Sequence, residues 1–163
     1  MEWYVRAFLK ASLAWLALGV TLGVAMAAHP VWTIYRLAHV HMVLLGFVTM
    51  MIFGVAYHVI PRFAGAPLRA RRVAVAHWWM SNIGLVAMAA GFVLRARGSA
   101  VGTIVLALGG TLSALGAYTF VVLLWRTIDG PTGARAAARR ASTMALQEDA
   151  GKLVPLATRA TRP

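Results

Sequence analysis

The sequence predicts an all-α protein, and more narrowly a polytopic membrane protein whose four transmembrane helices form a bundle. Hydrophobic residues make up 61% of the 163 positions, and all four acidic residues lie outside the apolar runs. A soluble domain of this length would need a more highly charged surface than this sequence provides. Four runs are long enough to cross a hydrocarbon core of about 30 Å, namely 11–28, 37–60, 73–94 and 101–125.

The basic residues predict how these helices are oriented, because lysines and arginines that flank apolar spans are retained on the cytoplasmic side. All but three of the 16 lysines and arginines lie before the first run, between the second and third runs, or after the fourth run. We therefore expect a protein of the cell inner (plasma) membrane with both termini in the cytoplasm. The net charge of +12 then reflects the basic residues that set the orientation in the membrane. We therefore expect membrane lipid rather than nucleic acid as a partner.

The chain divides into a transmembrane domain, residues 1–128, and a basic cytoplasmic tail, residues 129–163. Within the tail, the stretch ARAAARRASTMALQ has the composition of a short basic amphipathic helix that lies on a membrane surface. A partly disordered, solvated tail is the alternative.

The first run contains Gly19 and Gly23, whose spacing of four lets a second helix approach closely. His29 and Pro30 end this run, because the residue before a proline is pushed out of the α region. The second run begins with His39 and His41 and ends with His58.

A rise of about 1.5 Å per residue separates His39 from His58 by about 28 Å, so these two cannot bind one metal ion. The third run carries His77 with Ser81 and Asn82, polar groups that need partners inside a bundle. Antiparallel packing across a short loop would bring His77 near the depth of His58. The fourth run has small residues and no histidine, which indicates a packing role.

The histidines form two groups. His29, His39 and His41 gather near the outer face, and His58 and His77 near the inner face. A titratable side chain in a membrane helix indicates a functional site, and neutral imidazole binds haem iron, copper and zinc. His39 and His41 differ in direction by about 200° on a helix, so they cannot both point at one cofactor. For His58 and His77, hydrogen bonding to each other or to headgroups is the simpler alternative.

Arg36, His39, Gly54, Tyr57 and Pro61, followed by Gly-Ala-Pro, resemble the second helix of subunit I of the haem-copper oxidase superfamily. The similarity is greatest to C-type oxidases and nitric oxide reductases, and it extends weakly over residues 5–128. The resemblance implies that His39 is an axial ligand of a low-spin haem near the outer face. It also implies that His41 takes the place of a polar residue, usually Asn, two positions after that ligand.

The chain departs from that family in two ways. Subunit I has about twelve helices, and the later ones supply the copper ligands and the other haem ligands, whereas this chain has four runs. No carboxylate lies within the runs to relay protons. We therefore expect no reduction of oxygen or nitric oxide by this chain alone. Cysteine is absent, which excludes covalent haem attachment through C-x-x-C-H.

These observations lead to one main hypothesis and two alternatives. The main hypothesis is a b-type haem protein that transfers electrons, with His39 as an axial ligand. The second ligand would come from His29, His41, a second copy of the chain or another subunit. A second haem between His58 and His77 is a further hypothesis, and in a protein with two haems Thr49, Tyr57, Ser81 and Asn82 would be supporting polar groups. The alternatives are a copper-binding assembly protein that uses His29, His39, His41 and Met42, and a cofactor-free subunit of a larger respiratory complex.

Overall fold

The computed structural model describes residues 1–65, 68, 70–129 and 137–149. Within these residues the chain is helical and contains no strand, which confirms the predicted all-α class. Four helical stretches are long and apolar enough to cross a membrane: Trp3–Ala28, Pro30–Phe63, Arg71–Ala96 and Val101–Ile128. Each contains one of the four apolar runs and extends beyond it at one or both ends.

The first stretch is helix α1 (Trp3–Ala28), the third is α4 (Arg71–Ala96) and the fourth is α5 (Val101–Ile128). The second stretch is made of four segments in sequence. These are η1 (Pro30–Tyr35, a 3-10 helix), α2 (Arg36–His41), η2 (Met42–Thr49, a π-helix) and α3 (Met50–Phe63).

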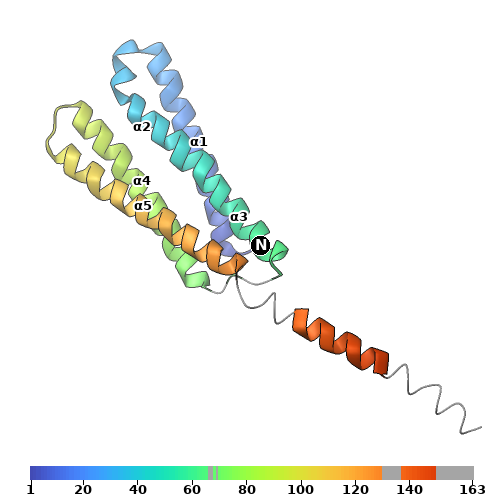
Figure 1. The fold of residues 1–163 in the computed structure, drawn as a ribbon. Coiled ribbons are helices and arrows are strands. Elements are labelled where there is room, and N and C mark those ends of the chain that lie inside the picture. Colours follow the sequence, from blue (N-terminus) through green and yellow to red (C-terminus); the bar gives the residue numbers. More distant parts are fainter. Residues whose placement is uncertain (66–67, 69, 130–136, 150–163) are drawn as a thin grey trace, which may run out of the picture.

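The helices form two antiparallel hairpins (Figure 1). In one hairpin α1 packs against η2 and α3, and in the other α4 packs against α5. We call the end that contains η1 and the α4–α5 turn the hairpin end. The opposite end, where α1 begins and α5 ends, is the tail end. The candidate histidines are therefore split as predicted, with His29, His39 and His41 at the hairpin end and His58 and His77 toward the tail end.

Glycines allow α4 and α5 to pack closely in their hairpin. A Cβ atom added to Gly91 would lie 2.6 Å from the backbone nitrogen of Leu106, and one added to Gly109 would lie 2.6 Å from that of Met88. Gly102, Gly109 and Gly116 recur every seven residues, so they stay on the same side of α5. The small residues of the fourth run therefore bring two helix backbones together.

The π-helical segment η2 is the main difference from the predicted second helix, which we expected to be a continuous α-helix. The hydroxyl of Thr49 donates a hydrogen bond of 2.8 Å to the carbonyl of Leu44, five residues earlier. At Gly46 the backbone is pressed between Trp15 of α1 and Leu85 of α4, and a Cβ atom there would lie 2.6 Å from the Cβ of Trp15. The wide turn thus lies where the second helix contacts both α1 of its own hairpin and α4 of the other.

Two contacts join the hairpins across the middle and the hairpin end. The indole N–H of Trp15 donates a hydrogen bond of 3.2 Å to Oδ1 of Asn82. At the hairpin end Nε of Arg97 donates one of 3.1 Å to the hydroxyl of Tyr35. Asn82 also donates to the carbonyl of Trp78 at 2.9 Å, so this polar side chain has the partners that a transmembrane position requires.

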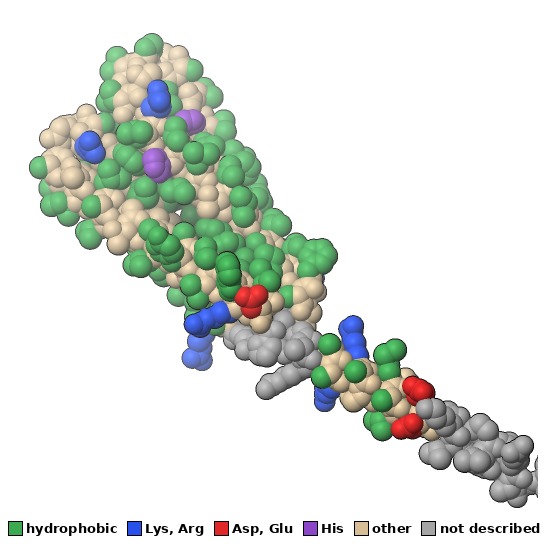
Figure 2. Space-filling view, in the orientation of Figure 1, with side chains coloured by type: hydrophobic (Ala, Val, Ile, Leu, Met, Phe, Trp, Pro, Cys, Tyr) green, Lys and Arg blue, Asp and Glu red, His purple; other side chains and the backbone are tan. Residues whose placement is uncertain are grey.

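The outer surface of the bundle is apolar along its length (Figure 2). Leu108 of α5, for example, is 67% exposed, and large apolar side chains are exposed on every spanning stretch. An apolar surface of this extent needs a nonaqueous surrounding, so the four stretches have both the length and the surface of membrane spans.

In the tail, residues 137–149 form a helix whose side chains are all exposed, and Figure 1 shows it apart from the bundle. It covers most of the stretch predicted to be an amphipathic helix, and residues 134–136 of that stretch lie outside the described residues. Ala66 and Pro67 of the Gly-Ala-Pro sequence also lie outside them, as do five of the basic residues that predict the orientation, Arg69, Arg135, Lys152, Arg159 and Arg162.

Candidate functional site

The candidate haem ligand His39 lies between two helices at the hairpin end. It comes from α2, and its Nδ1 is 2.8 Å from the backbone carbonyl oxygen of Gly19 in α1. The ring also lies beside Gly23, where an added Cβ atom would be 3.0 Å from Cε1. Gly23 therefore makes room for this imidazole, whereas Gly19 packs against Val43 and supplies the carbonyl that the ring contacts.

This contact decides which nitrogen of His39 is available. A carbonyl oxygen only accepts, so Nδ1 carries the proton and donates it to Gly19. Nε2 then has a free lone pair and no hydrogen-bond partner among the described residues. A backbone carbonyl that holds the non-ligating nitrogen is the usual way in which proteins orient a metal-binding imidazole.

His41 and His29 lie in other directions. Nδ1 of His41 donates to the carbonyl of Leu37 in its own helix at 2.8 Å, and its ring lies 4.7 Å from that of Phe92 in α4. The His29 ring lies 5.7 Å from the Trp32 ring and is exposed. His39 thus faces α1 while His41 faces α4, as predicted from the angle of about 200° between two helical residues that are two positions apart.

Near the tail end, His77 is completely buried inside a cluster of aromatic rings. Its Nδ1 shares a hydrogen bond of 2.8 Å with the hydroxyl of Tyr57. Its Nε2 is buried and has no partner. The rings of Phe8, Phe53 and Phe120 lie 4.6–5.8 Å from the imidazole. The described side chains enclose this histidine so closely that a porphyrin could reach it only if the aromatic cluster opened.

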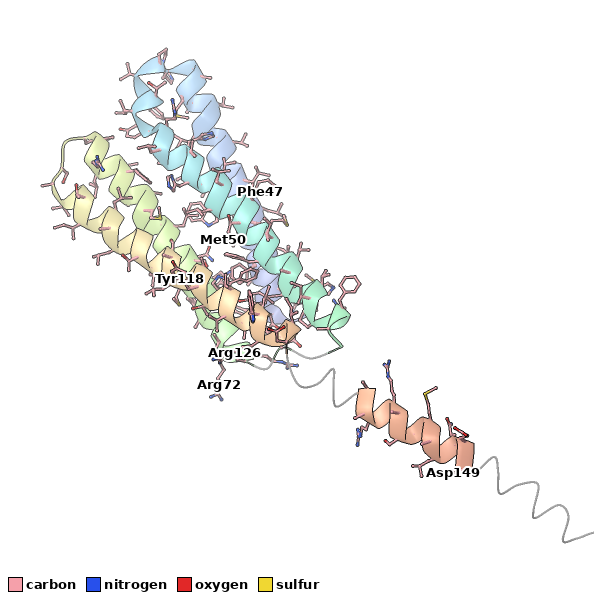
Figure 3. The ribbon with its side chains drawn as sticks, viewed as in Figure 1. Phe47, Met50, Arg72, Tyr118, Arg126 and Asp149 are labelled. Atoms are coloured by element: carbon pink, nitrogen blue, oxygen red, sulfur yellow. The ribbon has the colours of Figure 1, made fainter. Side chains whose placement is uncertain are left out.

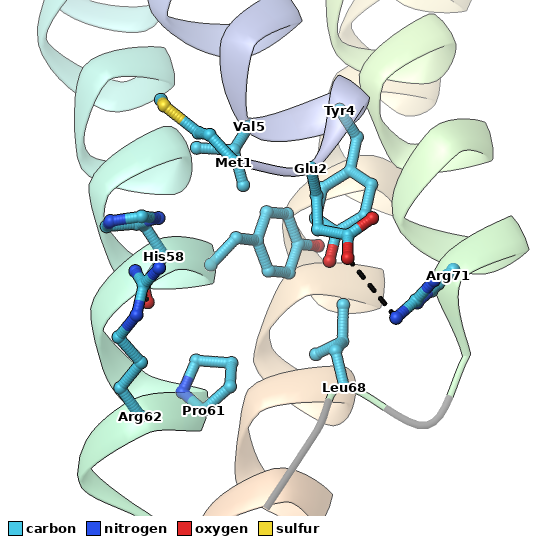
Figure 4. Close-up of a pocket in the computed structure, with 10 residues that line it drawn as sticks. Met1, Glu2, Tyr4, Val5, His58, Pro61, Arg62, Leu68 and Arg71 are labelled. Carbon is cyan, nitrogen blue, oxygen red and sulfur yellow. Dashed lines mark hydrogen bonds and ion pairs between the residues drawn. The ribbon is translucent and has the colours of Figure 1, made fainter.

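His58 faces a different space. It lines a pocket of about 200 Å³ at the tail end, together with residues that begin α1, end α3 and begin α4 (Figure 4). The Glu2 carboxylate in this pocket pairs with Arg71 at 3.2 Å. Tyr57, the residue next to His58, lines the pocket while its hydroxyl reaches His77. The structure therefore places Tyr57, and not His58, against His77.

The other polar residues that the sequence singled out have separate roles. Tyr57 bonds to His77, Asn82 accepts from Trp15, and Thr49 bonds to the carbonyl of Leu44 in its own helix. Ser81 lies near His77, because both side chains lie against Gly116. None of these side chains contacts His39. The group that orients the His39 ring is the backbone carbonyl of Gly19, and a search for side-chain motifs in the sequence cannot find a backbone group.

In the part of the chain that the structure describes, no three or more His, Cys, Asp or Glu side chains are grouped so that they could hold a metal ion. Nε2 of His39 has no partner, His41 lies on the opposite side of α2, and Nε2 of His77 is enclosed. If this chain alone supplied the protein ligands, a metal at His39 would need a cofactor that brings most of the other ligands.

Comparison of the sequence with models of protein families found no match, and comparison with curated proteins found none either. The resemblance to subunit I of the haem-copper oxidases therefore stays a prediction, which depends mainly on the residues of the second helix.

Proposed function

We propose that this chain is an integral membrane protein that binds haem b without a covalent bond, with Nε2 of His39 as an axial ligand to the iron. The observation that carries the proposal is the 2.8 Å contact between Nδ1 of His39 and the carbonyl of Gly19. This contact orients the ring from a neighbouring helix and leaves Nε2 free to bind iron.

The distribution of the histidines favours haem over a bare metal ion. A porphyrin supplies four nitrogen ligands, so one imidazole from the protein is enough to attach it. A copper or zinc site needs several protein ligands at one point. His29, His39 and His41 face different neighbours, which makes the alternative of a copper-binding assembly protein weaker.

In this proposal the second axial ligand of the haem, if there is one, comes from a second polypeptide. His41 lies on the opposite side of α2, and His77 is enclosed by aromatic rings. A second copy of this chain, or another subunit of a respiratory complex, would supply the remaining ligand or leave the position open. Bound haem would supply one-electron chemistry, and the chain would hold it and limit the access of water. His58 and His77 have no common cavity, so we do not extend the proposal to a second haem.

The proposal also includes the orientation. Arg62 at the end of α3, Arg71 and Arg72 at the start of α4, and Arg126 near the end of α5 lie at the tail end, where Figure 3 labels Arg72 and Arg126. With this end in the cytoplasm, as the distribution of basic residues predicts, His39 lies near the outer face of the cell inner membrane. The absence of a carboxylate from the apolar runs supports electron transfer rather than reduction of oxygen or nitric oxide by this chain alone.

The test is the haem content of the purified protein, measured by a pyridine haemochrome assay and by elemental analysis for iron and copper. We expect haem b in the wild-type protein and in His29→Ala, and little haem in His39→Ala. Circular dichroism would establish that the variants remain helical. Copper without iron would support the metal-ion alternative. A helical wild-type protein without either metal would support a cofactor-free subunit.

A spectrum of the reduced protein with and without carbon monoxide tests the second ligand. Binding of carbon monoxide at full occupancy would indicate an open position on the iron. An unchanged spectrum would indicate a second protein ligand and favour electron transfer.

A further inference from the structure

A second site is suggested by a groove between the tail ends of α1 and α4. The groove has a volume of about 570 Å³. Its lining is apolar apart from two basic residues of α1, Arg6 and Lys10. The other lining residues are Trp3, Ala7, Ala11 and Ala14 of α1 and Trp78 of α4. The groove is thus positively charged at its tail end and apolar toward the middle of the bundle.

The two charges in this groove have no counter-ion in the part of the chain that the structure describes. Among the described residues Arg6 and Lys10 make no ion pair, and the carboxylate closest to them in sequence, Glu2, pairs with Arg71. Lys10 directly precedes the first apolar run, so its ammonium group lies where the chain enters the apolar part of the membrane and can meet an anionic headgroup. An anionic ligand would satisfy both charges.

The walls of the groove provide an apolar path. Ala7, Ala11 and Ala14 lie three and four residues apart, so their small side chains leave an open strip along α1. The Trp3 and Trp78 rings pack edge to face at 5.7 Å, and tryptophan prefers the membrane interface.

We infer that this groove binds an anionic phospholipid. The phosphate lies between Arg6 and Lys10, and one acyl chain follows the strip of Ala7, Ala11 and Ala14. Basic pockets between transmembrane helices at the cytoplasmic side are a known type of binding site for anionic headgroups. Arg6 and Lys10 therefore have a binding role in addition to the topological role that the sequence assigns to them. The inference does not depend on the haem proposal.

Native mass spectrometry of the intact chain in detergent tests the inference, with phosphatidylglycerol, phosphatidylcholine and free glycerol 3-phosphate as the added ligands. We expect one phosphatidylglycerol to bind with about tenfold higher affinity than phosphatidylcholine. Arg6→Gln with Lys10→Gln should weaken the binding of phosphatidylglycerol about thirtyfold, since each basic residue contributes near an anionic surface. Both side chains are exposed, so the fold should be unaffected.

A matched control removes two charges at the same end of the bundle and leaves the groove intact. Arg72→Gln with Arg126→Gln should change the affinity by no more than about twofold. Ala14→Leu keeps every charge but fills the strip, and it should also weaken binding. Equal loss in the control variant, or undiminished binding by the Arg6 and Lys10 variant, would overturn the inference. Binding of glycerol 3-phosphate as tightly as phosphatidylglycerol would show a phosphate site without a role for the acyl chain, and would also overturn it.

Discussion

Replacing Tyr57 with Phe removes one hydroxyl from the most enclosed polar contact in the bundle. The Tyr57 side chain is 2% exposed and His77 is fully buried, so water cannot replace the lost hydrogen bond of 2.8 Å. The ring of Phe would keep the edge-to-face contacts that Tyr57 makes with Tyr4 and Phe120. The substitution therefore isolates the hydrogen bond from the packing around it.

The expected loss of unfolding free energy depends on the hydrogen bonds that the His77 ring would retain. Side-chain hydrogen bonds between transmembrane helices contribute about 0.6 kcal/mol on average, and up to about 1.7 kcal/mol. Nε2 of His77 already has no partner, so Tyr57→Phe would leave both ring nitrogens unpaired in an aromatic environment. An unpaired buried polar group costs about 1–3 kcal/mol. We therefore expect a loss near the upper end of the membrane range, about 1.5 kcal/mol.

The assay is equilibrium unfolding in mixed micelles of dodecyl maltoside and dodecyl sulfate, followed by circular dichroism. Tyr118→Phe is the matched control, because Tyr118 is 69% exposed on α5 and its loss of a hydroxyl should change the free energy of unfolding by less than about 0.5 kcal/mol. A second variant, Tyr57→Phe with His77→Leu, removes both partners and should recover much of the loss. If Tyr57→Phe were no more destabilising than Tyr118→Phe, this account of the aromatic cluster would be refuted.

Three further outcomes are expected. Gly109→Ala should lower the free energy of unfolding by about 1–3 kcal/mol because its new Cβ would meet the α4 backbone, whereas Gly110→Ala, which meets nothing, should be neutral or slightly stabilising in the same assay. Gly23→Val should lower the haem content without unfolding the protein, because the added side chain would displace the proposed ligand ring; full haem occupancy would contradict that placement. Single cysteines can be introduced into a chain that has none, so Ser99→Cys should react with an impermeant maleimide from outside intact cells and Ser142→Cys only after lysis; the reverse pattern would contradict the proposed orientation.

Hydrophobic length was enough to locate the spanning helices, because a lipid-facing helix is apolar on its outer surface as well as its inner one. Each of the four predicted runs lies within one helical stretch. Sequence spacing also separated the histidines correctly into two ends, since the rise of a helix is nearly constant. The opposite directions of His39 and His41 follow from the same regularity.

The sequence did not reveal the π-helical segment, because nothing in the run from Met42 to Thr49 distinguishes five-residue from four-residue hydrogen bonding. The π-helical hydrogen bonding occurs where Gly46 contacts Trp15 and Leu85, which come from two other helices. The groove at Arg6 and Lys10 was missed for a similar reason. The positive-inside rule accounts for Arg6 and Lys10 by themselves, so these charges do not predict a binding site. In the sequence, the spacing of Ala7, Ala11 and Ala14 is the signal for a groove beside them.

The sequence alone thus determined the helical class, the number and approximate position of the apolar spans, and the end of the bundle at which each histidine lies, since all of these depend on local composition and constant helix geometry. Only the tertiary structure decided which atom meets each imidazole. His39 meets the carbonyl of Gly19, whereas His77 meets Tyr57 instead of His58. These partners are set by the rotation and separation of neighbouring helices, which depend on close packing at glycines far apart in the chain.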